Sequence, residues 1–465
     1  MRALPRLLPV AWKLDDRDRD MKAHSMKSHL INAVFGVIDY LAYPVGLLLL
    51  APVILRALGM ERYGIWAVAT AAISTGAIIA SGFGDANIRA VAIALATGDR
   101  KNMIETIRCA LGIHLALGAA IACIGWCTAP WMTRHIAESR PELTLDCLWS
   151  LRIAGLLALI RAVETVFVST QRAFSRYGSA IQISVIARLL ALMAAGLVPM
   201  FVRSVSALLI VSFAIGLVAL WIQMNQLYRL LGVTRLTPAF HPEITRRFLV
   251  FGGFTWLCSV AGLLFGQADR LVAGVAFGAA AVSAYAFCVQ LAQPIYGISA
   301  AGLHFLFPYL TTRLAQSDNR ALRRGVLITA AANASFVLVA LGTLLLCGKG
   351  ILHFWAGEAI AAAASSLLPA IVWSSALSAL GVTGCYSMLA LGRPGMVTAF
   401  NVAGGLAMMG AIVLLVPHYG LAGIAYGRLC FGPTVLFLYV PLLMVLNRQS
   451  GQTDRAPEMA VCEEV

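Results

Sequence analysis

Residues 205–228 read VSALLIVSFAIGLVALWIQMNQLY and contain no charged side chain. A helix of this length and apolarity can cross the hydrocarbon core of a bilayer. Eleven further segments share this character, and charged or turn-rich stretches separate them. The sequence therefore predicts an all-α polytopic membrane protein with about 12 transmembrane helices. The other expected spans lie near residues 30–55, 63–82, 106–130, 148–170, 179–202, 248–275, 281–307, 325–347, 362–391, 395–417 and 420–446.

The composition of the 465-residue chain agrees with this fold class. Hydrophobic residues make up 60% of the sequence and charged residues only 12%, which is too few to cover a soluble protein. A polar stretch divides the expected spans into two groups of six, which predicts two lobes. The expected parts are a cytoplasmic N-terminal tail (1–29), an N-lobe (30–228), a cytoplasmic linker (229–247), a C-lobe (248–446) and a cytoplasmic C-terminal tail (447–465).

The distribution of Lys and Arg predicts the orientation of the chain. With the N-terminus inside, 24 of these residues fall on the inner side of the expected spans and six on the outer side. Cytoplasmic loops retain positive charge, so both termini are expected in the cytoplasm. The net charge of +14 is then explained by topology, and nucleic acid is not an expected partner.

Motifs for soluble catalysis are missing from the sequence. The ten cysteines show no metal-ligand spacing, and no phosphate-binding glycine loop or nucleophile elbow occurs. The expected loops are also too short to fold a catalytic domain. We therefore expect no metal, no cofactor and no enzymatic activity. A membrane-embedded glycan polymerase or transferase is the alternative from another class, with a site around His114 or His304.

Charged residues inside the expected spans are the strongest candidates for function, because burying them in hydrocarbon is costly. Arg161 and Glu164 are three residues apart, so they can pair on one face of a helix. Arg188 has no acid in its own span, which favours an anionic ligand. Asp39 precedes Pro44, whose missing N–H can leave a carbonyl open to an ion.

We expect the intramembrane arginines to bind substrate and the acids to act in ion coupling or charge pairing. Arginine suits phosphate oxygens because its planar fork never loses its charge. For Asp269, Arg270 and Arg428, a structural ion pair is the alternative. The substrate-binding set is Arg161, Arg188, Arg270 and Arg428, and the acidic set is Asp39, Glu164 and Asp269; Arg152 lies near a helix end.

The segment 55–66, LRALGMERYGIW, resembles the turn between the first two helices of Wzx-type polysaccharide flippases, with Gly59, Tyr63, Gly64 and Trp66 as its motif residues. Gly59 can adopt turn geometry and Gly64 allows close helix approach, while Tyr63 and Trp66 suit the membrane interface. A weak internal echo of this segment follows the seventh span at 278–285. Further matches are GFGD at 82–85, QR at 171–172, GG at 252–253, DR at 269–270 and YGLAG at 419–423.

This resemblance implies the fold of the multidrug/oligosaccharidyl-lipid/polysaccharide (MOP) superfamily, with two lobes that open alternately to each side. It implies a transporter in the inner (cytoplasmic) membrane that flips an undecaprenyl-pyrophosphate-linked oligosaccharide for O-antigen or exopolysaccharide assembly. The arginine-lined cleft between the lobes would be its path, and a glycan polymerase and a chain-length regulator its protein partners. A cation-coupled multidrug extruder is the alternative within the superfamily, which Asp39 and Glu164 keep open.

Overall fold

The computed structural model describes residues 43, 45–81, 83–138, 140–174, 177–246, 248, 253, 256–257, 266–303, 306–315 and 319–453. Asp39, His304 and the expected N-terminal tail lie outside these residues. All regular elements in the described part of the chain are helices, which confirms the expected fold class.

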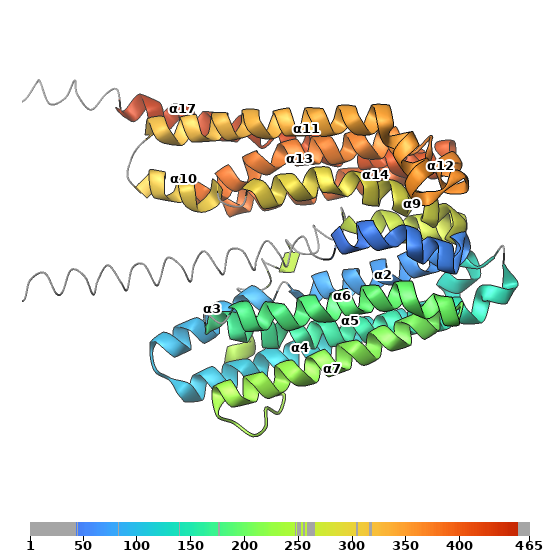
Figure 1. The fold of residues 1–465 in the computed structure, drawn as a ribbon. Coiled ribbons are helices and arrows are strands. Elements are labelled where there is room, and N and C mark those ends of the chain that lie inside the picture. Colours follow the sequence, from blue (N-terminus) through green and yellow to red (C-terminus); the bar gives the residue numbers. More distant parts are fainter. Residues whose placement is uncertain are drawn as a thin grey trace, which may run out of the picture.

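The helices form two bundles, one from each half of the sequence (Figure 1). The bundles meet at one end and diverge toward the end that carries α3, α10 and α17. The first bundle contains the helix Val45–Leu58, α2 (Met60–Ser81), α3 (Gly84–Ala96), α4 (Arg100–Ile136), the short η1 (Pro141–Leu143), α5 (Thr144–Ala173), α6 (Tyr177–Phe201) and α7 (Val205–Leu231). The second contains α9 (Ala268–Leu303), α10 (Leu306–Ala315), α11 (Asn319–Ala356), α12 (Glu358–Ala364), α13 (Leu368–Ala390), α14 (Pro394–Tyr419), α15 (Leu421–Arg428), α16 (Phe431–Leu436) and α17 (Tyr439–Thr453).

Eight helical segments of the described residues are long and apolar enough to cross a membrane. Helices α2 and α5, of 22 and 30 residues, have sufficient length as well. Large apolar side chains on these helices face outward, among them Phe201, Leu346 and Val413. Such side chains suit contact with lipid, so the chain is a multi-pass membrane protein.

Some expected spans differ in detail from the helices that the chain forms. The span near 420–446 is found as one helical segment, Leu421–Leu446, that is long enough to cross a membrane. Short turns divide it into α15, α16 and α17, because Pro433 and Pro441 cannot donate the backbone hydrogen bonds of a continuous helix. The connection expected after residue 82 contains α3. Conversely, α9 covers the end of the seventh expected span and most of the eighth, with non-helical backbone at Gly278 between the two parts.

The bundles pack together through α2 and α9, where the motif glycines of the sequence prove to be essential. A Cβ at position 64 would overlap the carbonyl oxygen of Ala279, so only glycine allows this approach. Gly59 and Gly278 both have positive φ, at 80° and 77°, which confirms the expected turn geometry at Gly59. Position 278 repeats that conformation in the second half of the chain.

Polar contacts accompany this close approach of α2 and α9. The Tyr63 hydroxyl lies 2.8 Å from Nε2 of Gln290, which donates to it, and the Ser283 hydroxyl donates to the carbonyl oxygen of Met60. The side chains of Tyr63 and Trp66 are 0% and 3% exposed. Tyr63 packs against Phe287 of α9 and against Trp66, so both rings are enclosed by protein, and their position at the membrane interface stays a prediction.

Candidate functional site

The Arg161–Glu164 pair on α5 is the centre of a buried polar network. Arg161 Nη1 lies 2.6 Å from Glu164 Oε2, as the three-residue spacing on one helix predicts. The other carboxylate oxygen accepts hydrogen bonds from Ser184 Oγ of α6 at 2.5 Å and from Gln223 Nε2 of α7 at 3.2 Å. Donors from three helices thus satisfy Glu164, which offsets the cost of burying its charge.

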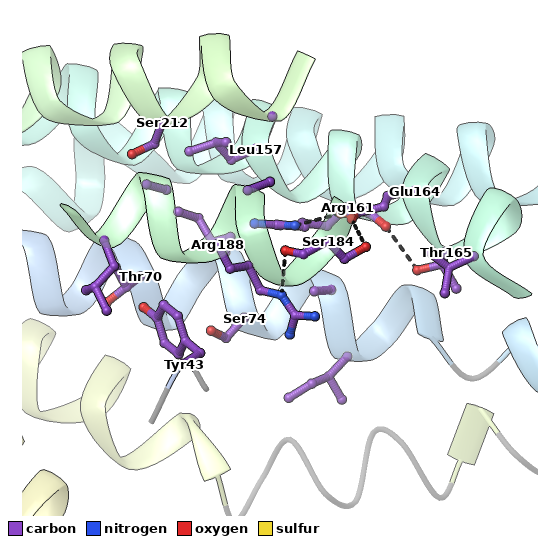
Figure 2. Close-up of a pocket in the computed structure, with 18 of the residues that line it drawn as sticks. Tyr43, Thr70, Ser74, Leu157, Arg161, Glu164, Thr165, Ser184, Arg188 and Ser212 are labelled. Carbon is purple, nitrogen blue, oxygen red and sulfur yellow. Dashed lines mark hydrogen bonds and ion pairs between the residues drawn. The ribbon is translucent and has the colours of Figure 1, made fainter. Parts of the chain in front are cut away.

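Arg188 extends this network on α6, one turn after Ser184. Its Nε donates to the carbonyl oxygen of Ser184 over 3.2 Å. Figure 2 shows the guanidinium reaching from α6 toward the side of α2 that carries Ser74, whereas Arg161 and Glu164 stay close to α5. The two arginines therefore present their charges to one space from two different helices.

This space is a cavity of about 780 Å³ within the first bundle. Of the described residues, three arginines and one glutamate line it, which gives these side chains together a net charge of +2. Among the residues that the structure describes, Gln267 is the lining residue that comes from the second half of the chain, and a cleft between the lobes stays a prediction. The polar lining residues of the cavity are Tyr43, Thr70, Ser74, Arg161, Glu164, Thr165, Ser169, Arg172, Ser184, Arg188, Ser212 and Gln267, and Trp66 adds an indole.

Arg270 lies close to the cavity without lining it. It is 9% exposed and acts electrostatically on Tyr43 and Tyr63. Arg161 and Arg188 act on Tyr43 as well. Tyr43 lines the same cavity as Arg161 and Arg188.

The fourth expected arginine, Arg428, is found in the second bundle, away from the cavity lining. Its Nη1 forms an ion pair with Asp269 Oδ2, and both side chains are buried. The Tyr285 hydroxyl donates to the same carboxylate oxygen over 2.6 Å, and the backbone N–H of Arg270 donates to Oδ1. Asp269 thus joins α9 to α15, which is the charge-pairing arrangement named among the alternatives.

Two polar residues of this site were not among the expected site residues. Gln223 lies on α7, and its polarity within an apolar span was the available signal. The sequence singled out Arg172 only through the QR match at 171–172, yet it lines the cavity. His114, the candidate for an embedded enzyme, packs against Phe83, and its Nδ1 lies 2.8 Å from the carbonyl oxygen of Ala110.

The described part of the chain contains no cluster of three His, Cys, Asp or Glu side chains that could hold a metal ion. Two buried ion pairs, Arg161–Glu164 and Arg428–Asp269, are found among the described residues. The arrangement can bind an anion in a partly apolar cavity, because arginine holds phosphate oxygens through charge-assisted hydrogen bonds.

Residues 53–362 match the family described as "Polysaccharide biosynthesis protein". The chain belongs to this family. A search of curated proteins gives no match. The family match covers the first bundle from residue 53 onward and continues into the second bundle as far as α12.

Solved structures share the fold of this polysaccharide biosynthesis family member. A lipid II flippase, MurJ, in an inward closed conformation gives a TM-score of 0.70 at 12% identity and covers 94% of this chain and 93% of its own. An inward-facing multidrug resistance MATE family transporter of the MOP superfamily gives 0.69 at 17% identity over 90% and 96% of the two chains. An outward-facing MATE family transporter of the MOP superfamily gives a TM-score of 0.58 at 14% identity and covers 90% of this chain and 96% of its own. The expected MOP-superfamily fold is thereby confirmed.

Proposed function

We propose that the protein flips an undecaprenyl-pyrophosphate-linked oligosaccharide from the cytoplasmic to the outer leaflet of the inner membrane. The observation that carries this proposal is the cavity whose described lining contains Arg161, Arg172 and Arg188 together with one acid, Glu164. A pyrophosphate diester bears two negative charges, which match the net charge of +2. The family match to polysaccharide biosynthesis proteins supports the glycan as cargo.

The cavity residues take different roles in this proposal. Arg188 and Arg161 hold the pyrophosphate, and Glu164 fixes the position of Arg161 through their 2.6 Å ion pair. Tyr43 and Arg270 receive the sugar end beside the cavity. Because Glu164 already accepts donors from three helices, we assign it to charge pairing. Asp39 keeps its proposed role in ion coupling.

The polyprenyl tail stays in lipid while the two bundles rock against each other, and the cavity opens first to the cytoplasm and then outward. An inside-negative membrane potential favours the outward movement of negative charge by roughly 2.3 kcal/mol per charge per 100 mV. No bond of the glycan changes, so the protein acts as a transporter and hands the repeat unit to a polymerase. Both termini lie in the cytoplasm in this orientation.

The direct test measures movement of an undecaprenyl-pyrophosphate oligosaccharide across proteoliposomes. The Arg188→Ala variant removes one cavity cation without leaving a buried carboxylate unpaired, so we expect a loss of at least about tenfold in flipping rate. Arg188→Lys keeps the charge and should retain part of the rate. Arg393→Ala, at an exposed loop position, is the matched control and should flip normally.

Wild-type protein that folds but moves none of the lipid would refute the proposal. The competing function is cation-coupled drug extrusion, which the acid Glu164 in the cavity and the similarity to MATE transporters favour. The same proteoliposomes loaded with a cationic dye distinguish the two. Dye export that depends on Glu164 and a lack of lipid movement would establish the extruder.

A further inference from the structure

A cation flanked by two tryptophans lies on the outer surface of the first bundle. The guanidinium carbon of Arg152 is 4.7 Å from the ring centroid of Trp126 and 5.3 Å from that of Trp149. The two indoles meet edge to face, with centroids 6.2 Å apart. Trp126 belongs to α4, and the other two residues belong to α5.

A close crossing of these two helices brings the three side chains together. A Cβ on Gly155 would lie 3.3 Å from the carbonyl oxygen of Ala122, and a Cβ on Gly125 would lie 3.6 Å from the Cα of Gly155. Residues on either side of the crossing therefore share one surface. None of the three side chains lines the cavity.

The position of this group along the helices matches the edge of a bilayer. Arg152 lies about 12 Å along α5 from its first residue, and Trp126 lies about 15 Å along α4 from its last. Tryptophan is enriched at this level of membrane proteins, and long basic side chains reach toward the headgroups there. Trp126 and Trp149 are 40% and 48% exposed, so both indoles face the lipid.

Arg152 retains hydrogen-bonding capacity in this setting. Its Nε is buried and has no hydrogen-bond partner, and none of the ion pairs among the described residues involves its guanidinium. The faces of the two tryptophans stabilise the cation by cation–π attraction, which supplies no hydrogen-bond acceptor to its N–H groups. An anionic oxygen donated by a lipid would complete the arrangement with charge-assisted hydrogen bonds.

We propose that Arg152, Trp126 and Trp149 bind the phosphate of an anionic phospholipid in the leaflet that adjoins the turn between α4 and α5. The guanidinium contacts the phosphate oxygens, and the indole N–H groups are within the same headgroup layer. Zwitterionic lipids carry a compensating ammonium, so they bind more weakly. This site is separate from the cavity and does not rest on the proposed transport function.

Native mass spectrometry of the purified full chain tests the proposal, with phosphatidylglycerol or phosphatidylcholine added in mixed micelles. We expect wild type to retain phosphatidylglycerol preferentially and Arg152→Gln to bind it about tenfold more weakly. Arg134→Gln is the matched control, because Arg134 is an exposed arginine in the last turn of α4. It should bind the lipid as wild type does.

Two further measurements separate the possible ligands and the effects on folding. Trp149→Leu removes one ring and should also weaken phosphatidylglycerol binding, while the thermal unfolding midpoint without lipid reports whether each variant folds. Inorganic phosphate at equal concentration should not compete. Equal retention of both lipids by wild type, or unchanged binding in a folded Arg152→Gln variant, would overturn the proposal, as would displacement of the lipid by inorganic phosphate.

Discussion

Single charged residues in this protein are stabilised by partners from other helices. Glu164 has donors on α5, α6 and α7, and Asp269 has donors on α9 and α15. The spacing of Arg161 and Glu164 made their pairing predictable, because a helix places residues i and i+3 together. A structural ion pair was the alternative for Asp269 and Arg428, but spacing could not name the partners, since 159 positions separate the two residues and only the packing of α15 against α9 brings them together.

Breaking the Asp269–Arg428 pair should destabilise the second bundle strongly. Asp269→Asn or Arg428→Gln leaves one buried group without its counter-charge, at a cost of about 3–5 kcal/mol. A double variant, Asp269→Leu with Arg428→Met, should recover most of that loss, because no lone charge is left. Unfolding midpoints in detergent measure the effect, and a double variant less stable than both single variants would contradict this account.

Asp146 should stabilise the start of α7 in a pH-dependent way. Burial alone would raise the pKa of Asp146, but hydrogen bonds from Ser206, Val205 and Ser204 outweigh it and hold the pKa below the ordinary value of 3.8. The charged form is therefore favoured in the folded state, and its contribution is present above the ordinary pKa and is lost as the pH falls through the lowered value.

The Asp146→Ala variant tests this contribution. Because the carboxylate satisfies backbone N–H groups at a helix start, the variant should lose about 1 kcal/mol at neutral pH. The difference in unfolding free energy between the variant and wild type should become smaller as the pH falls below 3.8. Unfolding midpoints across a pH series measure it, and a constant difference down to the lowest pH would speak against the carboxylate as the source.

At the scale of elements, continuous apolar runs were predictable and interruptions were less so. The expected spans 106–130 and 205–228 correspond to α4 and α7, which extend beyond them because charged residues are tolerated in helix ends outside the bilayer. The breaks between α15, α16 and α17 follow the prolines at 433 and 441, a signal that was present in the sequence. The extent of the α2–α9 contact depends on tertiary packing, which spacing within one helix does not encode.

Replacing Gly64 should separate α2 from α9. In Gly64→Ala the new methyl group meets the backbone of Ala279, which cannot move like a flexible side chain, so we expect a loss of about 1–3 kcal/mol. Gly410→Ala on α14 is the control, because a Cβ there meets no atom within 4 Å. Spin-label distances between the two bundles and unfolding midpoints both report the change. Equal behaviour of the two variants would rule out a special role for Gly64.

At the scale of the whole molecule, the two bundles meet at one end, and the cavity lies in the first of them (Figure 1, Figure 2). The excess of Lys and Arg on one side of the expected spans predicts that both termini lie in the cytoplasm.

Cysteine labelling in intact cells tests the orientation. In a chain whose own cysteines are replaced, Glu138→Cys should react with an impermeant maleimide from outside, because residue 138 lies in the turn after α4. Arg235→Cys, in the segment after α7, should react only once the membrane is permeabilised. Both positions are exposed, so access to the reagent differs only by side. The reverse labelling pattern would place both termini outside.

Helix α2 contributes residues both to the cavity and to the contact between the bundles. Trp66, Thr70 and Ser74 line the cavity, while Tyr63 and Gly64 contact α9. A ligand that alters how tightly α2 holds α9 is linked to that contact by thermodynamic reciprocity. The factor by which bound cargo changes the equilibrium constant of the α2–α9 contact must equal the factor by which that contact changes the binding constant for cargo. Cargo bound as we propose would therefore be coupled to the α2–α9 contact through one helix that belongs to both sites.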